Sequence, residues 1–286
     1  MGGCDWLRID LHMHSTHSDG AMTPREIVAE ALRLGLSVIS ITDHDEISGY
    51  FEAKELATSC GLQLLSGIEF NTDGAQGELH ILGYGFDSNH PSMLEYVKWR
   101  KDERREWSKE IVERLQNLGY PIDWEDCWQR AGGQVIVRTH IADELVAKGF
   151  FSSSKQAYDQ LLKKGGQAFV SRRGLSAEAA IGLIHECGGK AFLAHPGEYD
   201  WSYSFEALLE AGLDGIEVYY SKHEHREREY WLKRAAKHQL LVSVGSDFHG
   251  YDSRSPYPIG SVDYDTKRLE WVFGQLEGKA LKKFRI

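Results

Sequence analysis

Histidine and acidic side chains recur at the ends of short apolar segments that are expected to be strands. His12 and His14 follow Ile9-Asp10-Leu11, and they share one face because strand residues i and i+2 point the same way. A histidine or an acidic residue also follows each of four later apolar segments, and Asp19 lies in the loop before the first expected helix. His80 instead lies at the beginning of its strand. We therefore expect that this strand runs in the opposite direction and brings His80 to the same edge as the other candidates. The candidate metal ligands are His12, His14, Asp19, His44, Glu69, His80, His195, Asp247 and His249.

The chemistry of this set indicates the class of metal. A single histidine beside a strand is more often structural than a ligand, but nine donors at strand ends are not independent accidents. Imidazole and carboxylate without thiolate suit Mn²⁺, Fe²⁺ or Zn²⁺. Nine donors exceed the needs of one ion, so we expect two or three ions bridged by Glu69 or Asp19. Asp43 and Asp45 are expected to orient imidazoles. We interpret the histidines outside these positions as structural: His17, His90, His185, His223, His225 and His238.

The elements that must position these donors alternate between strand and helix. Thr23-Pro24-Arg25-Glu26 is a capping box with proline at the first helical position, and a β-branched strand over residues 37–42 follows the helix. Ser176 and Ser204 begin later helices, and strands are expected over residues 190–194, 215–219 and 240–245. Further helices are expected over about 223–238 and 267–284. Repeated βα units predict a parallel α/β fold, most simply a closed barrel, with an open doubly wound sheet as the alternative.

The alternation stops in the middle of the chain. Apolar residues at helical spacing, among many charges, indicate a long helix over about 94–118, and shorter helices are expected over 140–148 and 155–164. We therefore divide the chain into a first barrel part, 1–92, a mainly helical insertion, 93–176, and a second barrel part, 177–286. An insertion of this kind is a natural cap and substrate-recognition domain over one end of a barrel.

Six motifs, in order, resemble those of the PHP (polymerase and histidinol phosphatase) superfamily: His12-Met13-His14-Ser15, Thr42-Asp43-His44-Asp45, Gly67-Ile68-Glu69, His80, Ala194-His195-Pro196 and Gly245-Ser246-Asp247-Phe248-His249. The resemblance implies a distorted (β/α)7 barrel with a trinuclear centre that hydrolyses phosphate esters. We expect Mn²⁺ as the metal, and our hypothesis for the reaction is attack by a hydroxide that bridges two ions. The resemblance groups His12, His14, Glu69 and Asp247 on one ion, Asp19, His44 and His249 on a second, and His80 and His195 on a third, with Glu69 bridging. Asp247, His195 and His249 are the candidates for proton transfer.

Val137-Arg138-Thr139-His140, at the start of an expected helix, narrows the resemblance to one branch. That branch contains 3′,5′-nucleoside bisphosphate phosphatases and related 5′-to-3′ exoribonucleases that act on very short RNA. Arg138 offers a fork for phosphate, His140 offers a second donor, and the helix start offers free N–H groups. Arg172 and Arg173 are further candidates for a distal phosphate, with a plain surface pair as the alternative. The substrate implied is a small phosphorylated nucleotide, or a short RNA.

Charge and composition limit the other functions. The chain has 33 basic and 43 acidic residues, a formal charge of −10, which disfavours binding of duplex DNA by a basic face. We expect a cytoplasmic protein, because the four cysteines are scattered and no apolar segment is long enough for a membrane. The alternatives are another phosphatase of the superfamily, of the histidinol-phosphate phosphatase type, and a non-catalytic metal-binding module.

Overall fold

The computed structural model describes residues 8–73, 78–132, 136–201, 203–253 and 255–276. The chain divides into two compact units, one formed by Met1–Leu94 with Leu175–Ile286 and the other by Glu95–Gly174. In the first unit the strands are β1 (Ile9–Asp10), β2 (Val38–Ser40), β3 (Gln63–Leu65), β4 (Gly67–Thr72), β5 (Leu79–Tyr84), β6 (Lys190–Leu193), β7 (Gly215–Tyr220) and β8 (Leu241–Gly245).

The strands of the first unit form two sheets. β1, β2 and β3 are parallel, whereas β5 runs antiparallel to both β4 and β6, and β6, β7 and β8 are parallel. Backbone hydrogen bonds join the sheets at two places, from Leu11 N to Val244 O (3.0 Å) and from Asp45 N to Glu69 O (2.9 Å). The result is a mixed α/β fold, in which the antiparallel β5 is the return strand that was expected to carry His80.

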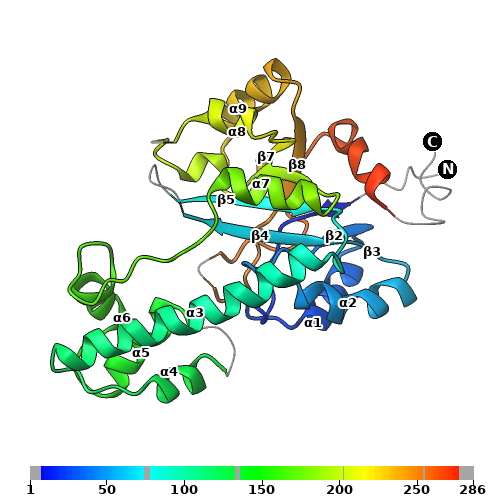
Figure 1. Cartoon of the computed structure of the whole chain (residues 1–286). Coiled ribbons are helices and arrows are strands. Elements are labelled where there is room, and N and C mark those ends of the chain that lie inside the picture. Colours follow the sequence, from blue (N-terminus) through cyan, green and yellow to red (C-terminus); the bar gives the residue numbers. More distant parts are fainter. Residues whose placement is uncertain (1–7, 74–77, 133–135, 202, 254, 277–286) are drawn as a thin grey trace. The chain divides into compact units, whose positions relative to one another are not determined.

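The helices of the first unit are α1 (Pro24–Arg33), α2 (Ser48–Ser59), α7 (Ala177–Glu186), α8 (Phe205–Glu210) and α9 (His225–Lys237). α1 and α2 lie next to each other beside β2 and β3, and α7 lies along β5 (Figure 1). The expected capping box is present: Thr23 Oγ1 accepts from Glu26 N, and the Glu26 carboxylate accepts from Thr23 N at 2.8 Å. Ser176 and Ser204 likewise accept hydrogen bonds at the starts of α7 and α8.

The core of this unit places the apolar face of α1 against β2. Ile27, Val28 and Ala31 of α1 are fully buried against Ile39 and neighbouring apolar residues. The helix predicted over 267–284 is confirmed over its described part, where Thr266–Gln275 is helical but of the 3-10 type; residues 277–284 of that prediction lie outside the described residues. A short 3-10 helix also spans Pro196–Glu198.

The described residues of the second unit form helices joined by turns and irregular segments, with no strand among them. It contains most of α3 (Pro91–Asn117), which begins in the first unit, with α4 (Trp124–Arg130), α5 (Arg138–Ala147), α6 (Ser154–Ala157) and a π-helical turn over Tyr158–Leu162. α4 was not anticipated from the sequence. This unit buries its own apolar cluster, in which Trp107, Ile111 and Leu115 of α3 pack with residues of α5 such as Ile141 and Leu145.

Candidate metal centre

The nine candidate ligands converge in the first unit. His12 and His14 follow β1, His44 follows β2, His195 follows β6, and Asp247 and His249 follow β8. Glu69 lies within β4, His80 lies within β5 and Asp19 lies in the turn before α1. Parallel strands bring their carboxyl ends to one edge, and the reversed β5 brings its beginning to the same edge. Three groups of side chains could each hold an ion: His14, Asp19, His44 and His249; His12, His14 and Asp247; and His44, Glu69 and His80.

Four donor atoms form the tightest part of the centre. His12 Nε2 lies 3.1 Å from His14 Nε2, 3.3 Å from Glu69 Oε2 and 3.4 Å from Asp247 Oδ1. His14 Nε2 lies 3.1 Å from the same Glu69 oxygen and 3.2 Å from Asp247 Oδ1. Ligands placed about 2.1 Å from a common ion are separated by roughly 3.0–3.4 Å in octahedral or tetrahedral geometry. The spacing of these atoms therefore fits a single divalent ion.

The Glu69 carboxylate faces two groups of imidazoles. Its Oε2 atom approaches His12, His14 and also His44 Nδ1, the last at 3.0 Å. Its Oε1 atom lies 2.8 Å from His80 Nδ1 and 3.0 Å from His195 Nε2. Because each oxygen faces a different group, this side chain has the geometry of a bridging ligand.

Asp19 organises the remaining donors. Its Oδ1 atom lies 3.2 Å from His249 Nε2, 3.7 Å from His14 Nδ1 and 3.8 Å from His44 Nε2. Gly20 makes this turn feasible, because a Cβ atom there would lie 2.1 Å from the carbonyl oxygen of His14. His14 and His44 thus present one ring nitrogen to Asp19 and the other to Glu69.

Several donor atoms are buried and lack hydrogen bonds among the described residues. Glu69 Oε2, His44 Nδ1 and His249 Nε2 are inaccessible to solvent and make none. His44 Nδ1 and Glu69 Oε2 are only 3.0 Å apart, yet they are not aligned as donor and acceptor. Buried polar atoms that converge in this way are costly unless a cation satisfies them. The residues present therefore fit a bound metal.

The site is strongly coupled electrostatically. Burial opposes the imidazolium form of His14, but the carboxylates of Asp247 and Glu69 outweigh it and raise the pKa of His14 to about 10. Burial would raise the pKa of Glu69, but the imidazoles of His44 and His12 hold it well below its usual range. Without a metal, protons supply the positive charge that the carboxylates require. A divalent ion would replace those protons.

Several buried partners of the ligands escaped sequence analysis. Glu217, in the middle of β7, contacts His12 Nδ1 through Oε1 at 2.9 Å. Tyr220 donates its hydroxyl proton to Asp247 Oδ2 at 3.0 Å, and His80 N donates to the Tyr199 hydroxyl at 2.9 Å. The available signal for Glu217 was an acidic residue inside the otherwise apolar strand Gly215–Tyr220.

The role expected for Asp43 was wrong in its detail. Rather than hydrogen-bonding an imidazole, it accepts from Ser15 N (2.7 Å), Ser15 Oγ (2.6 Å) and Ser18 Oγ (2.6 Å). Ser18 Oγ lies 3.5 Å from His14 Nδ1, so Asp43 reaches that imidazole through a hydroxyl group. Asp45 accepts from the backbone N–H and the side-chain amide of Asn71.

The basic residues predicted to bind phosphate lie in the second unit. Arg138 is the first residue of α5, where its Nη2 atom donates to Val170 O at 2.9 Å. Its guanidinium lies over the rings of Trp107 (5.1 Å) and Phe169 (4.9 Å). Three further candidates have local contacts: Val137 N donates to His140 Nδ1, Arg172 lies over Trp107, and Arg173 N donates to Glu103 Oε1.

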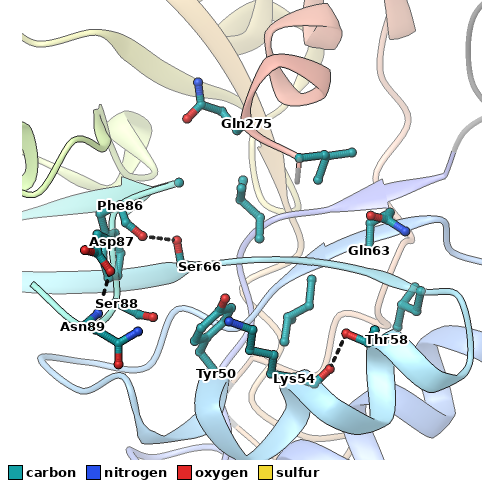
Figure 2. A pocket seen from close by; sticks show the side chains of 15 residues that line it. Tyr50, Lys54, Thr58, Gln63, Ser66, Phe86, Asp87, Ser88, Asn89 and Gln275 are labelled. Atoms are coloured by element: carbon teal, nitrogen blue, oxygen red, sulfur yellow. Dashed lines mark hydrogen bonds between the residues drawn. The ribbon is translucent and has the colours of Figure 1, made fainter. Parts of the chain in front are cut away.

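A separate cavity of about 380 Å³ in the first unit is lined by none of the nine candidate ligands. It lies between α2, β3 and the segment after β5, and Figure 2 shows Lys54 and Tyr50 on one side with Gln275 across from them. Two of its polar groups already have partners, since Ser66 Oγ donates to Phe86 O and Asp87 Oδ1 accepts from Asn89 N.

A mixed α/β fold that gathers imidazoles and carboxylates in this way defines a metal-dependent hydrolase. The chain belongs to the PHP-domain family, whose model matches residues 10–253. A crystal structure of a protein from Bifidobacterium adolescentis assigned as a metal-dependent phosphoesterase superposes with a TM-score of 0.80 at 30% identity, covering 96% of this chain and 98% of that one. The protein is therefore a metal-dependent phosphoesterase.

Curated relatives act on different phosphate esters. The 5′-3′ exoribonuclease Rnm of Salmonella typhimurium is 34% identical over 247 residues, 84% of each chain. The 3′,5′-nucleoside bisphosphate phosphatase of Chromobacterium violaceum is 33% identical over 247 residues, 84% of this chain and 87% of that protein. The phosphoribosyl 1,2-cyclic phosphate 1,2-diphosphodiesterase of Eggerthella lenta is 31% identical over 252 residues, 87% and 96% of the two chains. Of the helices described, none has the length and apolar character to cross a membrane.

Proposed function

We propose that this enzyme removes the 3′-phosphate of 3′,5′-nucleoside bisphosphates and also hydrolyses short 5′-phosphorylated oligoribonucleotides. The observation that carries the hydrolytic part is the convergence of His12, His14, Glu69 and Asp247 at ligand spacing. The nucleotide part is supported by the names of the relatives and by Arg138 at the start of α5. We also propose a cytoplasmic location, and a distorted (β/α)7 barrel in which the two sheets are parts of one closed structure.

The centre is proposed to hold two or three divalent ions, with Mn²⁺ as the preferred metal. Bound ions of this kind supply Lewis-acid polarisation of the phosphoryl group and a water of lowered pKa. Three divalent ions carry +6 and the carboxylates of Asp19, Glu69 and Asp247 carry −3, so the loaded centre is positive although the chain is acidic. An anionic substrate is therefore attracted to this site.

The side chains around the centre divide the remaining work. Tyr220 holds Asp247 through Oδ2, and Oδ1 faces His12 and His14 as a donor atom of the centre. In this proposal Asp247 is also the candidate to accept a proton from the attacking water. His195 and His249 are the candidates to protonate the leaving oxygen. The backbone of Asp247 has a φ of 55°, a left-handed conformation that few side chains adopt without a constraint.

The helical insertion expected over residues 93–176, which contains the second unit Glu95–Gly174, is proposed to recognise the substrate. Arg138, His140 and Arg173 would bind a phosphate remote from the one being hydrolysed. Arg138 is stacked on aromatic rings and hydrogen-bonded to Val170, so its guanidinium is held in a defined orientation rather than free to rotate. A preorganised guanidinium loses less entropy when it binds phosphate.

A substrate panel with Mn²⁺ tests the proposal. We expect the highest kcat/KM for 3′,5′-bisphosphates, release of mononucleotides from short 5′-phosphorylated RNA, and low rates for simple monophosphates and histidinol phosphate. Asp247→Asn is the inactive control. A preference for histidinol phosphate or for a 1,2-cyclic phosphate would refute the proposed substrate. No hydrolysis of any of these by a metal-loaded protein would favour the binding module instead.

A further inference from the structure

Glu217 is a carboxylate buried in the interior of the first unit. It lies in the middle of β7, between Ile216 and Val218, and its exposed fraction is 0%. An ionised carboxylate in such a place is tolerated only when its oxygens are satisfied by specific donors. Both oxygens are used here, and each is used by a histidine of the metal centre.

One oxygen orients the ring of His12. Glu217 Oε1 lies 2.9 Å from His12 Nδ1, and because a carboxylate only accepts, the Nδ1 atom carries the proton. The lone pair of the ring is then on Nε2, which faces His14, Glu69 and Asp247. Glu217 thus selects the tautomer and the ring orientation that a metal requires.

The other oxygen anchors the backbone of His195. The ladder between β6 and β7 ends at Leu193 and Ile216, and beyond it His195 N donates to Glu217 Oε2 at 2.8 Å. His195 has a φ of 26° and a ψ of 58°, an uncommon conformation for a residue other than glycine. The hydrogen bond holds this strained residue where its Nε2 atom is 3.0 Å from Glu69 Oε1.

The neighbouring strand leaves room for this arrangement. Gly245, at the end of β8, would place a Cβ atom 2.4 Å from Glu217 Oε1 and 2.2 Å from the Cβ atom of His12. Any side chain there would displace the contact between the carboxylate and the imidazole. The glycine is therefore a second, independent feature built around the same pair.

We propose that Glu217 is a positioning residue of the metal centre, which uses its two oxygens to hold His12 and His195 at the spacing that metal binding requires. Glu217 lies on strand β7 and connects His12, which follows β1, with His195, which follows β6. None of the nine candidate ligands lies on β7. This inference rests on the assignment of His12 and His195 to the metal centre, and it is independent of the identity of the substrate.

The test is the Mn²⁺ affinity of Glu217→Gln, measured by calorimetry and by competition with a chelator. Glutamine keeps the shape but can accept from only one of the two N–H groups, and its amide would face the other. We expect the dissociation constant to rise about 10–100-fold. In the metal-free protein we also expect the downfield proton resonance of His12 Nδ1–H to shift or disappear. kcat should fall more than KM changes.

Glu144→Gln is the matched control, because Glu144 is also a buried carboxylate but pairs with Arg130 in the second unit. It should leave Mn²⁺ affinity unchanged. If Glu217→Gln does not fold, the same measurement is made on Glu217→Asp. The shorter side chain of aspartate cannot reach both histidines, so Mn²⁺ affinity should again fall. Wild-type affinity and an unchanged His12 resonance in the variant that folds would overturn the role of Glu217. A wild-type protein that binds no metal would instead refute the metal centre.

Discussion

Replacing Glu69 by glutamine should remove more metal than replacing any peripheral ligand. The carboxylate lies between 2.8 and 3.3 Å from ring nitrogens of five histidines, and its two oxygens face different groups of donors. Glutamine retains the size of the side chain, but it removes the negative charge and turns one oxygen into a donor. Two of the three donor groups should therefore lose affinity, and the group around Asp19 should be affected least.

The size of the effect follows from linkage between binding and folding. At a Mn²⁺ concentration of about 100 times the dissociation constant, each occupied site stabilises the folded state by about 2.7 kcal/mol. Loss of two sites then removes about 5 kcal/mol of metal-dependent stability. For a chain of this size, at roughly 2–4 °C per kcal/mol, the Mn²⁺-dependent rise in Tm should shrink by about 10–20 °C.

The assay is scanning calorimetry of the metal-free and Mn²⁺-loaded proteins, with metal content measured on the same samples. Glu144→Gln serves again as a buried carboxylate remote in sequence from the ligands. Glu69→Gln should contain one ion or fewer per chain. If it kept the metal content and the Mn²⁺-dependent rise in Tm of the wild type, Glu69 would not be the shared ligand.

Three further predictions concern pH, packing and substrate recognition. Because Asp247 and Glu69 raise the pKa of His14 to about 10, Mn²⁺ must displace a proton below that pH. Its affinity should rise about tenfold per pH unit for each proton displaced, and a dissociation constant that is the same at pH 6 and pH 8 would contradict this. Gly67→Ala would place a methyl group 2.0 Å from Ser40 Oγ and should destabilise the fold by about 1–3 kcal/mol in urea unfolding. Gly182→Ala, which meets nothing within 4 Å in helix α7, should instead stabilise it by up to about 1 kcal/mol. Arg138→Ala should lower kcat/KM for bisphosphates more than for monophosphates, and equal losses on both would argue against its recognition role.

Local sequence was sufficient to predict features that depend only on residues close together in the chain, such as the starts of helices. The capping box of Thr23 and Glu26 joins residues three apart, and the N-caps of Ser176 and Ser204 do the same. The placement of donors after strands was also readable, because the carboxyl ends of parallel strands meet at one edge. The sequence pattern also predicted a helix in the C-terminal segment, but it did not predict that Thr266–Gln275 would be of the 3-10 type.

The sequence by itself determined which residue types were available to a metal and at which strand ends they lie. Tertiary structure decided how they share the space. Glu69 faces five imidazoles, and Glu217 joins His12 to His195. Strand register and packing bring His12 and Glu217, and likewise Glu69 and His195, to within 3.0 Å, although each of these pairs is more than one hundred positions apart in the chain. Such contacts have no periodic signal along the chain. A buried carboxylate is recognisable as a partner only when the strands on both sides of it are in place.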